Sequence, residues 1–299
     1  MAFDLSALTA YVEQNRGELL GKAILRGKTL DVIRHQPGVK GSAAINILDV
    51  DVKFRDGATC GFTAAGDDEF SQRLIETKIL EVNKQWCYKD LVGYWTAEEM
   101  RNRIIAGDKV LTFEEFITNK IVESVNAELE VISWQGNASN PAITGLLGQF
   151  TAASETVQAL TGTTALEKVQ EVYNAIPEEV LDKAVIFVSA GTFRGFVQGL
   201  VGANLYHYNP GAPIDEVYIP GTNTRVIKVN GLNNATEQTK TNLIVAADPN
   251  NLVYGYDVED SPRTFDLWYE RKDDAMLLRL ETNAGFQIAF PNEVVIFGE

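Results

Sequence analysis

The stretch Phe113–Phe150, FEEFITNKIVESVNAELEVISWQGNASNPAITGLLGQF, joins a long amphipathic segment to a loop rich in asparagine, glycine and proline. Thr112 precedes it as a helix cap, and Glu114 and Glu115 complement the helix dipole in the first turn. About 24 residues at ~1.5 Å each predict a helix of roughly 36 Å, which is long for a globular protein. One apolar stripe follows the helical period. It consists of Phe113, Phe116, Ile117, Ile121, Val125, Leu129 and Ile132.

Extended patterns precede this helix. Residues 45–54 (INILDVDVKF) alternate apolar and polar side chains, which predicts a strand with a bulge near Asp49. A glycine-containing turn region follows, and residues 73–92 again favour extended structure. We interpret Ile45–Lys89 as one long ribbon of two strands. Because an isolated ribbon is marginally stable in water, a surface outside it is expected to hold it.

The segment before the ribbon, Met1–Gly41, has apolar residues at helical spacing, but glycines interrupt the pattern. Glycine weakens the interior of a helix, so we predict an arm with short helical pieces. The apolar side of this arm is expected to be buried against another surface.

Helix and strand patterns alternate after the loop. The first three are a helix over 164–183 that is broken near Pro177, a buried strand over 184–190 and a short helix over 191–202. A hairpin over 216–232 follows, and then a strand over 242–257 with a turn at 248–250. Further strands are predicted from 264 onward. In the short helix, Gly191, Gly195 and Gly199 indicate close packing against a neighbour. Segregated helices and antiparallel strands favour an α+β fold over a doubly wound parallel sheet.

Composition and charge limit the function classes. The chain has 299 residues, 45% hydrophobic and 22% charged, which fits a folded protein of one or two domains. A net charge of -15 argues against a protein that binds nucleic acid mainly through electrostatics. The N-terminus lacks a basic segment followed by an apolar core, so no signal peptide is expected. No apolar run reaches the ~20 residues of a membrane span.

Histidines and cysteines are few. His35 and His207 lie in no motif for a nucleophile or a metal site. Cys60 and Cys87 lack the CxxC spacing of a zinc site, and we expect two ordinary thiols rather than a disulfide.

Acidic clusters occur at 67–69, 257–260 and 273–274. Their spacing fits solvated turns better than cation sites. No glycine-rich phosphate loop opens a helix anywhere in the sequence. We therefore predict no catalytic, cofactor-binding or metal-binding residue and no cofactor, and we expect a protein that is not an enzyme.

The order of the predicted elements is more specific than any single motif. An arm, a long ribbon, a long helix, a glycine-containing loop, an α/β region and closing strands resemble, over nearly the whole chain, the major capsid proteins of tailed bacteriophages, whose fold is named for the Hong Kong coliphage. Phe113–Phe150 resembles the family's spine helix and the loop after it. The loop pattern G…P…G-L-L is matched by Gly136, Pro141, Gly145 and Leu146.

Two further stretches carry the resemblance. Residues 184–200 (AVIFVSAGTFRGFVQGL) resemble a strand and helix of that family, although Ser189-Ala190 stands where Asn-Pro is frequent. Residues 264–299 resemble its closing segment, in which a strand, an acidic turn, a long strand and a final strand near a proline follow in order.

The resemblance implies an α+β phage major capsid fold of four regions. These are an N-terminal arm at 1–44, an extended two-stranded loop at 45–89 that reaches over a neighbouring subunit, a peripheral domain at 90–140 and 251–299 with the spine helix, and an axial domain at 141–250 that lines the centre of a capsomer. The loop after Trp134 then needs no catalytic residue, because it only turns the chain from a strut into the axial domain.

The same resemblance implies a structural subunit that assembles with copies of itself into hexamers and pentamers of an icosahedral shell around double-stranded DNA. Such a protein is located in the virion capsid, assembles in the host cytoplasm and needs no membrane. Scaffolding, portal and decoration proteins are further partners that the resemblance implies. Because the sequence starts directly at the arm, a separate scaffolding protein or none is expected. Lys53 lies in the extended loop, where some relatives form Lys–Asn cross-links, but no partner is identifiable and we predict no bond.

Two alternatives stay open at this point. An encapsulin, a cellular compartment built on the same fold, differs in enclosing an enzyme cargo. A metal-dependent or carbohydrate-active enzyme using the acidic clusters predicts a compact particle with a concave pocket.

Overall fold

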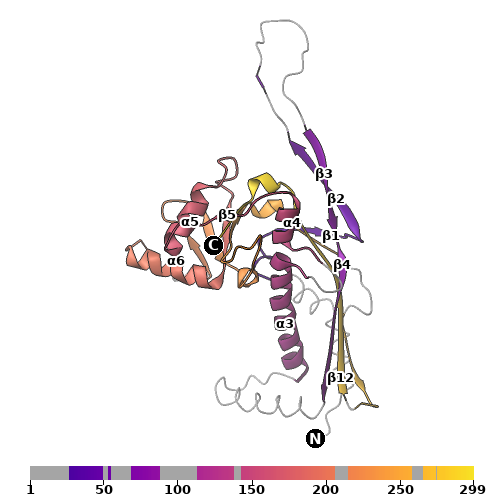
Figure 1. Ribbon diagram of the computed structural model, residues 1–299. Helices are drawn as coiled ribbons and strands as arrows, with labels where there is room; N and C mark the ends of the chain where they lie inside the picture. Colours follow the sequence, from indigo (N-terminus) through magenta and orange to yellow (C-terminus); the bar gives the residue numbers. More distant parts are fainter. Residues whose placement is uncertain are drawn as a thin grey trace, which may run out of the picture.

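The computed structural model describes residues 27–49, 53–54, 69–87, 113–137, 143–205, 215–257, 265–273 and 275–299. Figure 1 shows an elongated molecule, in which a long sheet and a projecting ribbon run beside an α/β unit. The strand pairs are mostly antiparallel and the chain also contains several helices, so the fold is α+β, as the sequence predicts.

A five-stranded sheet, here called the long sheet, forms the extended side of the molecule. Its central strand is β12 (Ala275–Ile288). On one side, β12 pairs antiparallel with β11 (Phe265–Glu270) and β10 (Leu252–Asp257), which follow each other along its length. On the other side it pairs with β4 (Lys78–Cys87). β1 (Arg34–Pro37) joins β10 in parallel.

The ribbon consists of β2 (Ser42–Asp49) and β3 (Glu69–Glu76), which pair only with each other among the described strands. It confirms the predicted two-stranded excursion, but it ends at Glu76. The predicted ribbon also included Lys78–Cys87, and this is wrong because these residues form β4, which pairs with β12. The cause is a change of phase near Thr77. In the ribbon and at Thr77, the buried residues have odd numbers, for example Ile75. In β4, the partly buried residues Leu80 and Val82 have even numbers.

The long helix is confirmed as α3 (Phe113–Gln135). It runs beside β4 and β12 in Figure 1. The predicted stripe faces the core over its described part, where Ile121, Leu129 and Ile132 are buried and Val125 is partly buried. Thr112 and the side chains of residues 113–117 lie outside the described residues.

A six-stranded mixed sheet organises the α/β unit. Its strand order is β5 (Gln158–Ala159), β13 (Val295–Gly298), β9 (Ile244–Ala247), β6 (Val185–Val188), β8 (Arg225–Lys228) and β7 (Glu216–Tyr218). The predicted buried strand is β6, whose four residues are all buried. The predicted hairpin is β7 with β8, in which Val217 lies opposite Val226.

Helices cover both faces of this sheet. The outer face carries α5 (Ala165–Asn174) and α6 (Ala190–Gly202), which pack on Ile186 and Val226. The inner face meets α3 and the short α4 (Leu146–Ala152) in a core that continues into the long sheet. Short 3-10 turns connect the strands at η1 (Asn230–Leu232), η2 (Pro249–Asn251) and η3 (Pro291–Glu293).

Two of the three glycines in α6 have the predicted packing role. A Cβ atom on Gly195 would lie 2.9 Å from the Cβ of Ala165, and one on Gly199 would lie 3.0 Å from the Cβ of Leu166. These glycines therefore let α6 approach the first turn of α5. At Gly191 the nearest atom would be the Ser189 Oγ at 3.9 Å, so this position is not tightly packed.

The chain crosses between the two sheets twice near its C-terminus, through η2 and through η3. The buried Asn251 joins the crossings, because its Nδ2 donates to the Phe290 carbonyl at 2.7 Å and its Oδ1 accepts from the Phe290 amide at 2.6 Å. The predicted turn at Asp248–Asn250 is thus the point at which the chain leaves the six-stranded sheet for the long sheet.

The strand pairings differ from the predicted domain boundaries at two places. β1 lies within the predicted arm but belongs to the long sheet. β13 lies within the predicted peripheral domain but pairs with β9 in the six-stranded sheet. In both cases a short strand completes a sheet that is formed by distant residues, which local sequence patterns do not reveal.

The loop after α3 is built on two facing glycines. Gly136 has φ +74, and a Cβ there would lie 2.4 Å from the Ile143 carbonyl oxygen. A Cβ on Gly145 would lie 2.4 Å from both the Gly136 amide nitrogen and the Trp134 carbonyl oxygen. Asn137 and Ile143 close the loop through two backbone hydrogen bonds of 2.8 and 3.0 Å. Pro141 lies outside the described residues.

Gly145→Ala is predicted to destabilise the fold by about 1–3 kcal/mol or more, since the new methyl group meets backbone atoms that cannot move independently. The backbone of Gly145 (φ -76, ψ 175) suits alanine, so the effect is steric. Gly202→Ala is the matched control, because a Cβ there meets no atom within 4 Å. Chemical denaturation followed by circular dichroism measures both. Equal stability of the two variants would contradict the packing described for the loop.

Candidate assembly surface

The ribbon presents an exposed apolar face. Cross-strand register places Leu48 opposite Phe70 and Ala44 opposite Leu74. The side chains of Leu48, Phe70 and Leu74 are 54%, 78% and 59% exposed. Between these pairs, Gln72 Nε2 donates to Asn46 Oδ1 at 2.9 Å. We call Ala44, Asn46, Leu48, Phe70, Gln72 and Leu74 the ribbon face.

The opposite side of the ribbon is anchored at its root. Ile45, Ile47 and Ile75 are buried and form a small cluster with Val39, Val253 and Ala289. Ile75 fits against β10 where Gly255 leaves room, since a Cβ on Gly255 would lie 2.7 Å from the Ile75 Cδ1. The ribbon is therefore apolar on both sides, and only one side has a partner within the described chain.

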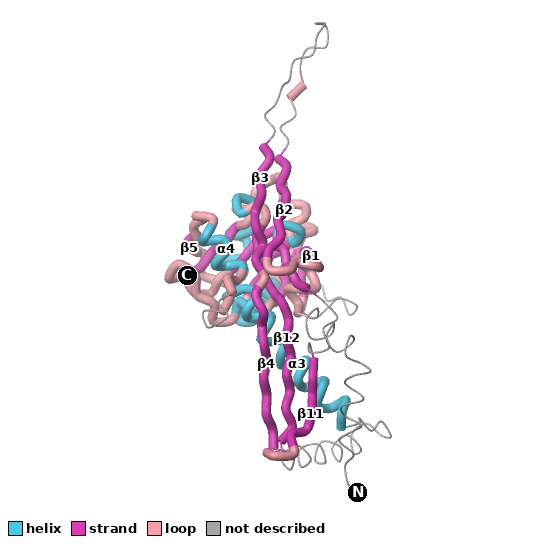
Figure 2. The backbone as a smooth tube through the Cα atoms, turned by 90° about the vertical axis from the view of Figure 1, so that its right-hand side faces the viewer, coloured by secondary structure: helices cyan, strands magenta, loops and turns pink. Residues whose placement is uncertain are grey.

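Hydrogen bonds reinforce the root. Arg73 Nη1 donates to the Ile288 carbonyl at 2.9 Å, and Gln287 Nε2 donates to the Leu74 carbonyl at 2.8 Å. The Thr77 hydroxyl donates to the Val39 carbonyl at 3.1 Å. The first two bonds join β3 to the end of β12, and the third joins Thr77 to the segment after β1. The root is therefore held in place, while the rest of the ribbon projects beyond the α/β unit (Figure 2).

A fixed, projecting apolar surface needs an explanation. Monomeric soluble proteins rarely expose contiguous apolar groups on a rigid element unless another molecule covers them. Both strands of the ribbon also have one backbone edge that no described strand pairs with, which is a second means of association. The ribbon face can bury apolar area against a partner without any rearrangement of its root.

The histidines, cysteines and acidic clusters that the sequence offered as candidate site residues lie apart from one another, as far as the structure describes them. His35 lies on β1 with its ring edge-on to Tyr254 and Tyr256, and its Nε2 is 2.5 Å from the Leu30 carbonyl oxygen. Burial raises the pKa of the Tyr254 hydroxyl, which therefore stays protonated. Cys87 is exposed at the end of β4. This arrangement brings together no nucleophile with a base.

The remaining candidates are incomplete in the described part of the chain. His207, Cys60, Asp67 and Asp68 lie outside it, as do residues 258–260 and Asp274. Among the described residues, no group of three His, Cys, Asp or Glu side chains is arranged to hold a metal ion. No described helix has the length and apolar composition needed to cross a membrane.

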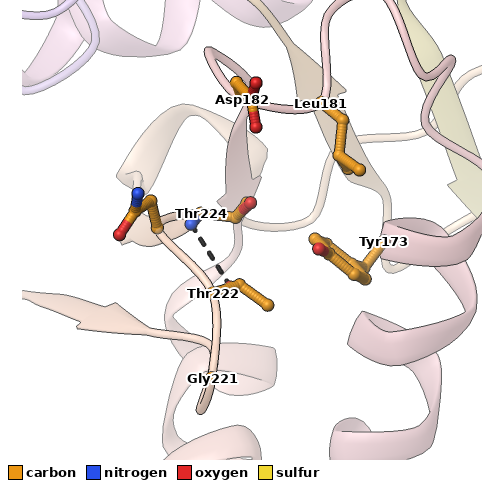
Figure 3. A pocket seen from close by; sticks show the side chains of 7 residues that line it. Tyr173, Leu181, Asp182, Gly221, Thr222 and Thr224 are labelled. Carbon is orange, nitrogen blue, oxygen red and sulfur yellow. Dashed lines mark hydrogen bonds between the residues drawn. The ribbon is translucent and has the colours of Figure 1, made fainter.

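A shallow polar pocket of about 390 Å³ lies between the end of α5 and the β7–β8 turn (Figure 3). Tyr173 and Leu181 line one side, and Thr222 and Thr224 the other. The Thr222 hydroxyl donates to the Ile219 carbonyl at 3.0 Å and accepts from the Thr224 amide at 3.3 Å. The Thr222 hydroxyl thus holds the β7–β8 turn together.

Comparison with solved structures identifies the fold. A chain of the satellite phage P4 procapsid, in a structure that includes size determination (Sid) protein, matches with a TM-score of 0.61 at 12% identity, over 100% of this chain and 91% of that chain. A chain of Gordonia phage Cozz matches with a TM-score of 0.58 at 11% identity, over 90% and 85%. The capsid of the empty GTA particle matches with a TM-score of 0.56 at 10% identity, over 93% and 89%.

The chain has the phage capsid fold. The fold that the sequence resemblance implied is thereby confirmed, with α3 as its spine helix and β2–β3 as its extended loop. No protein-family model matches the chain, and a search of curated proteins finds no match either. At 10–12% identity, these matches rest on the three-dimensional fold rather than on shared residues.

Sequence reasoning missed the ribbon face of this capsid fold, although a signal was present. Ile45 and Ile47 alternate as a one-sided strand, but Leu48 adds an apolar residue on the other face. In β3, Phe70 and Leu74 are likewise apolar residues on the exposed face, and the buried Ile75 lies on the other face. Two apolar faces on a ribbon with only two strands indicate two contact surfaces.

Ile75→Ala is predicted to loosen the ribbon root and to cost about 2–5 kcal/mol locally, because it empties a fully buried site. Hydrogen–deuterium exchange should rise in 42–49 and 69–76 and stay unchanged in α5 and α6. Leu74→Ala, at the adjacent exposed position, is the matched control and should leave exchange near the wild-type level. Unchanged exchange in both variants would show that the root cluster does not hold the ribbon.

Proposed function

We propose that this protein is a shell subunit, which assembles with copies of itself into hexamers and pentamers of an icosahedral capsid around double-stranded DNA. The observation that carries the proposal is the ribbon face: a rooted, projecting strand pair with three exposed large apolar side chains. The capsid fold supports it, because the matching procapsid and capsid chains have the same arrangement over most of their length. The protein acts structurally rather than as an enzyme.

Burial of the ribbon face on a neighbouring copy supplies the association energy. Covering one large apolar side chain completely contributes about 1.5–3 kcal/mol, and part of the total is offset by the loss of freedom on association. Each contact is therefore modest, and stability comes from the closed arrangement in which every subunit gives and receives one ribbon. Modest contacts also let misplaced subunits dissociate during assembly.

We assign the remaining regions the roles that the family resemblance implies, and we take the members of each unit from the strand pairings. The six-stranded sheet with α5 and α6 is the axial unit at the capsomer centre, and it includes β13. The long sheet with α3 is the peripheral unit, and it includes β1 and β4. The net charge of -15 suits a container wall, because an acidic wall encloses DNA without binding it tightly. Scaffolding, portal and decoration proteins are the partners expected of such a shell, and the virion is its location.

Phe70→Glu with Leu74→Glu is predicted to abolish shell assembly while the subunit stays folded, because charged groups replace apolar ones at the surface to be buried. Size-exclusion chromatography with light scattering, and electron microscopy of the purified protein, measure assembly. Circular dichroism confirms the fold. The wild type should form capsomers or megadalton particles.

Ser71→Glu is the control, since it adds one negative charge to the same strand on the opposite face and should leave assembly intact. Normal particles from the double variant would overturn the role of the ribbon face. A wild-type protein that elutes only near its 32.9 kDa subunit mass under all conditions would overturn the shell function itself.

A further inference from the structure

The segment Gly27–Ile33, here called the strap, lies against the C-terminal half of the spine helix. Thr29 is fully buried, and so is Leu30. The Thr29 amide donates to the Glu130 carboxylate at 3.1 and 3.3 Å, and the Thr29 Oγ1 lies 2.5 Å from Glu130 Oε1. A large part of the attachment of the strap to α3 is therefore the carboxyl group of Glu130, a residue that is only 4% exposed.

Tight packing surrounds this carboxyl group. Trp134 Nε1 donates to the Thr29 hydroxyl oxygen at 2.7 Å. A Cβ on Gly27 would lie 2.7 Å from Glu130 Oε2, and one on Gly231 in η1 would lie 2.3 Å from the Glu130 carbonyl oxygen. The strap and η1 thus enclose Glu130 closely, and lifting the strap would expose it to water.

Few charges lie near Glu130. From the strap, Lys28 favours its ionised form and Asp31 disfavours it. Lys28 is itself paired with Asp215, which also binds Lys228 at 2.5 Å. Glu216 lies near Lys28 as well, whereas η1 contributes no charged side chain. Lys28 therefore interacts with Asp215 and Glu216 as well as with Glu130.

Both protonation states of Glu130 fit this geometry. As a carboxylate, it accepts from the amide and the hydroxyl of Thr29. As a carboxylic acid, its Oε1–H can donate to the Thr29 hydroxyl oxygen across the same short contact, while Oε2 still accepts from the amide. The Thr29 hydroxyl oxygen then accepts from both Trp134 Nε1 and Glu130, and its own proton has to turn away from Oε1. Burial raises the pKa of the Glu130 carboxyl above its usual value, and the hydrogen bonds from Thr29 oppose this only in part.

We propose that Glu130 and Thr29 form a proton-operated latch, in which the strap stays closed on the spine helix when the carboxyl is protonated and opens more often when it is ionised. When the strap opens, water hydrates the charged Glu130 carboxylate, and this hydration favours the open state. This inference concerns the interior of a single subunit and goes beyond the proposed shell function. It links pH to the fraction of molecules in which the strap is open.

The direction follows from linkage. The closed strap raises the pKa of Glu130, so closure binds a proton and is strongest below the usual carboxyl pKa of 4.5. As pH rises from there toward the raised value, the population of the open strap grows about tenfold per pH unit, and above that value it becomes constant.

Hydrogen–deuterium exchange of the peptide that contains residues 27–33 tests the latch, on the purified full chain and after correction for the intrinsic exchange rate. In the wild type, protection should fall with rising pH through this window. In Glu130→Gln, which keeps an oxygen acceptor for the Thr29 amide, protection should not depend on pH. Glu123→Gln is the matched control on the exposed side of α3, where Glu123 pairs with Lys120 at 3.1 Å, and it should behave like the wild type.

Asp31→Asn provides a second variant at an exposed position of the strap. Removing this negative charge should move the upper end of the pH window to lower pH. His35 also contacts the strap, through the Leu30 carbonyl, and it is unchanged in these variants. A pH-dependent protection that persists in Glu130→Gln would therefore assign the effect to another group and overturn the latch. Protection that is independent of pH in the wild type would overturn it as well, and neither result depends on whether particles assemble.

Discussion

The pairing of β12 on both of its sides is the constraint on which the rest of the structure depends. β4 occupies one side of this fourteen-residue strand, and β11 and β10 share the other. This arrangement fixes where the ribbon leaves the body, because β3 leads directly into β4. It also fixes where the chain crosses between the two sheets, because β10 begins and β12 ends beside the hydrogen bonds that join Asn251 to Phe290. The spine helix then packs its apolar stripe into the core that β12 borders.

Much of the fold could be predicted from the sequence. α3 follows from a regular apolar period, β6 from an uninterrupted apolar run, and the β7–β8 hairpin from its turn residues. These elements could be predicted because each pattern lies entirely within the residues that form the element. The order of elements added the capsid architecture, although no single motif was specific.

What the sequence could not provide are pairings between distant segments. β1 and β13 are four residues each, and the strands with which they pair lie far from them in the sequence. The ribbon face was missed because sequence patterns show which residues are apolar but not which apolar residues remain uncovered. Likewise, Glu130 falls on the helical stripe between Leu129 and Ile132. Only the structure shows that Thr29 lies over it.

The continuity of β3 and β4 has a mechanical consequence. The two strands are separated only by Thr77, and a Cβ on Gly285 of β12 would lie 2.1 Å from the Glu76 carbonyl oxygen, so the junction is seated tightly on the sheet. Tension applied to the ribbon runs along the axis of β4 and loads the hydrogen bonds of its ladder in shear, all at once. Peeling would instead break them one after another at a lower force. The chain is thus more resistant to tension along the ribbon axis than to forces that peel β4 from β12.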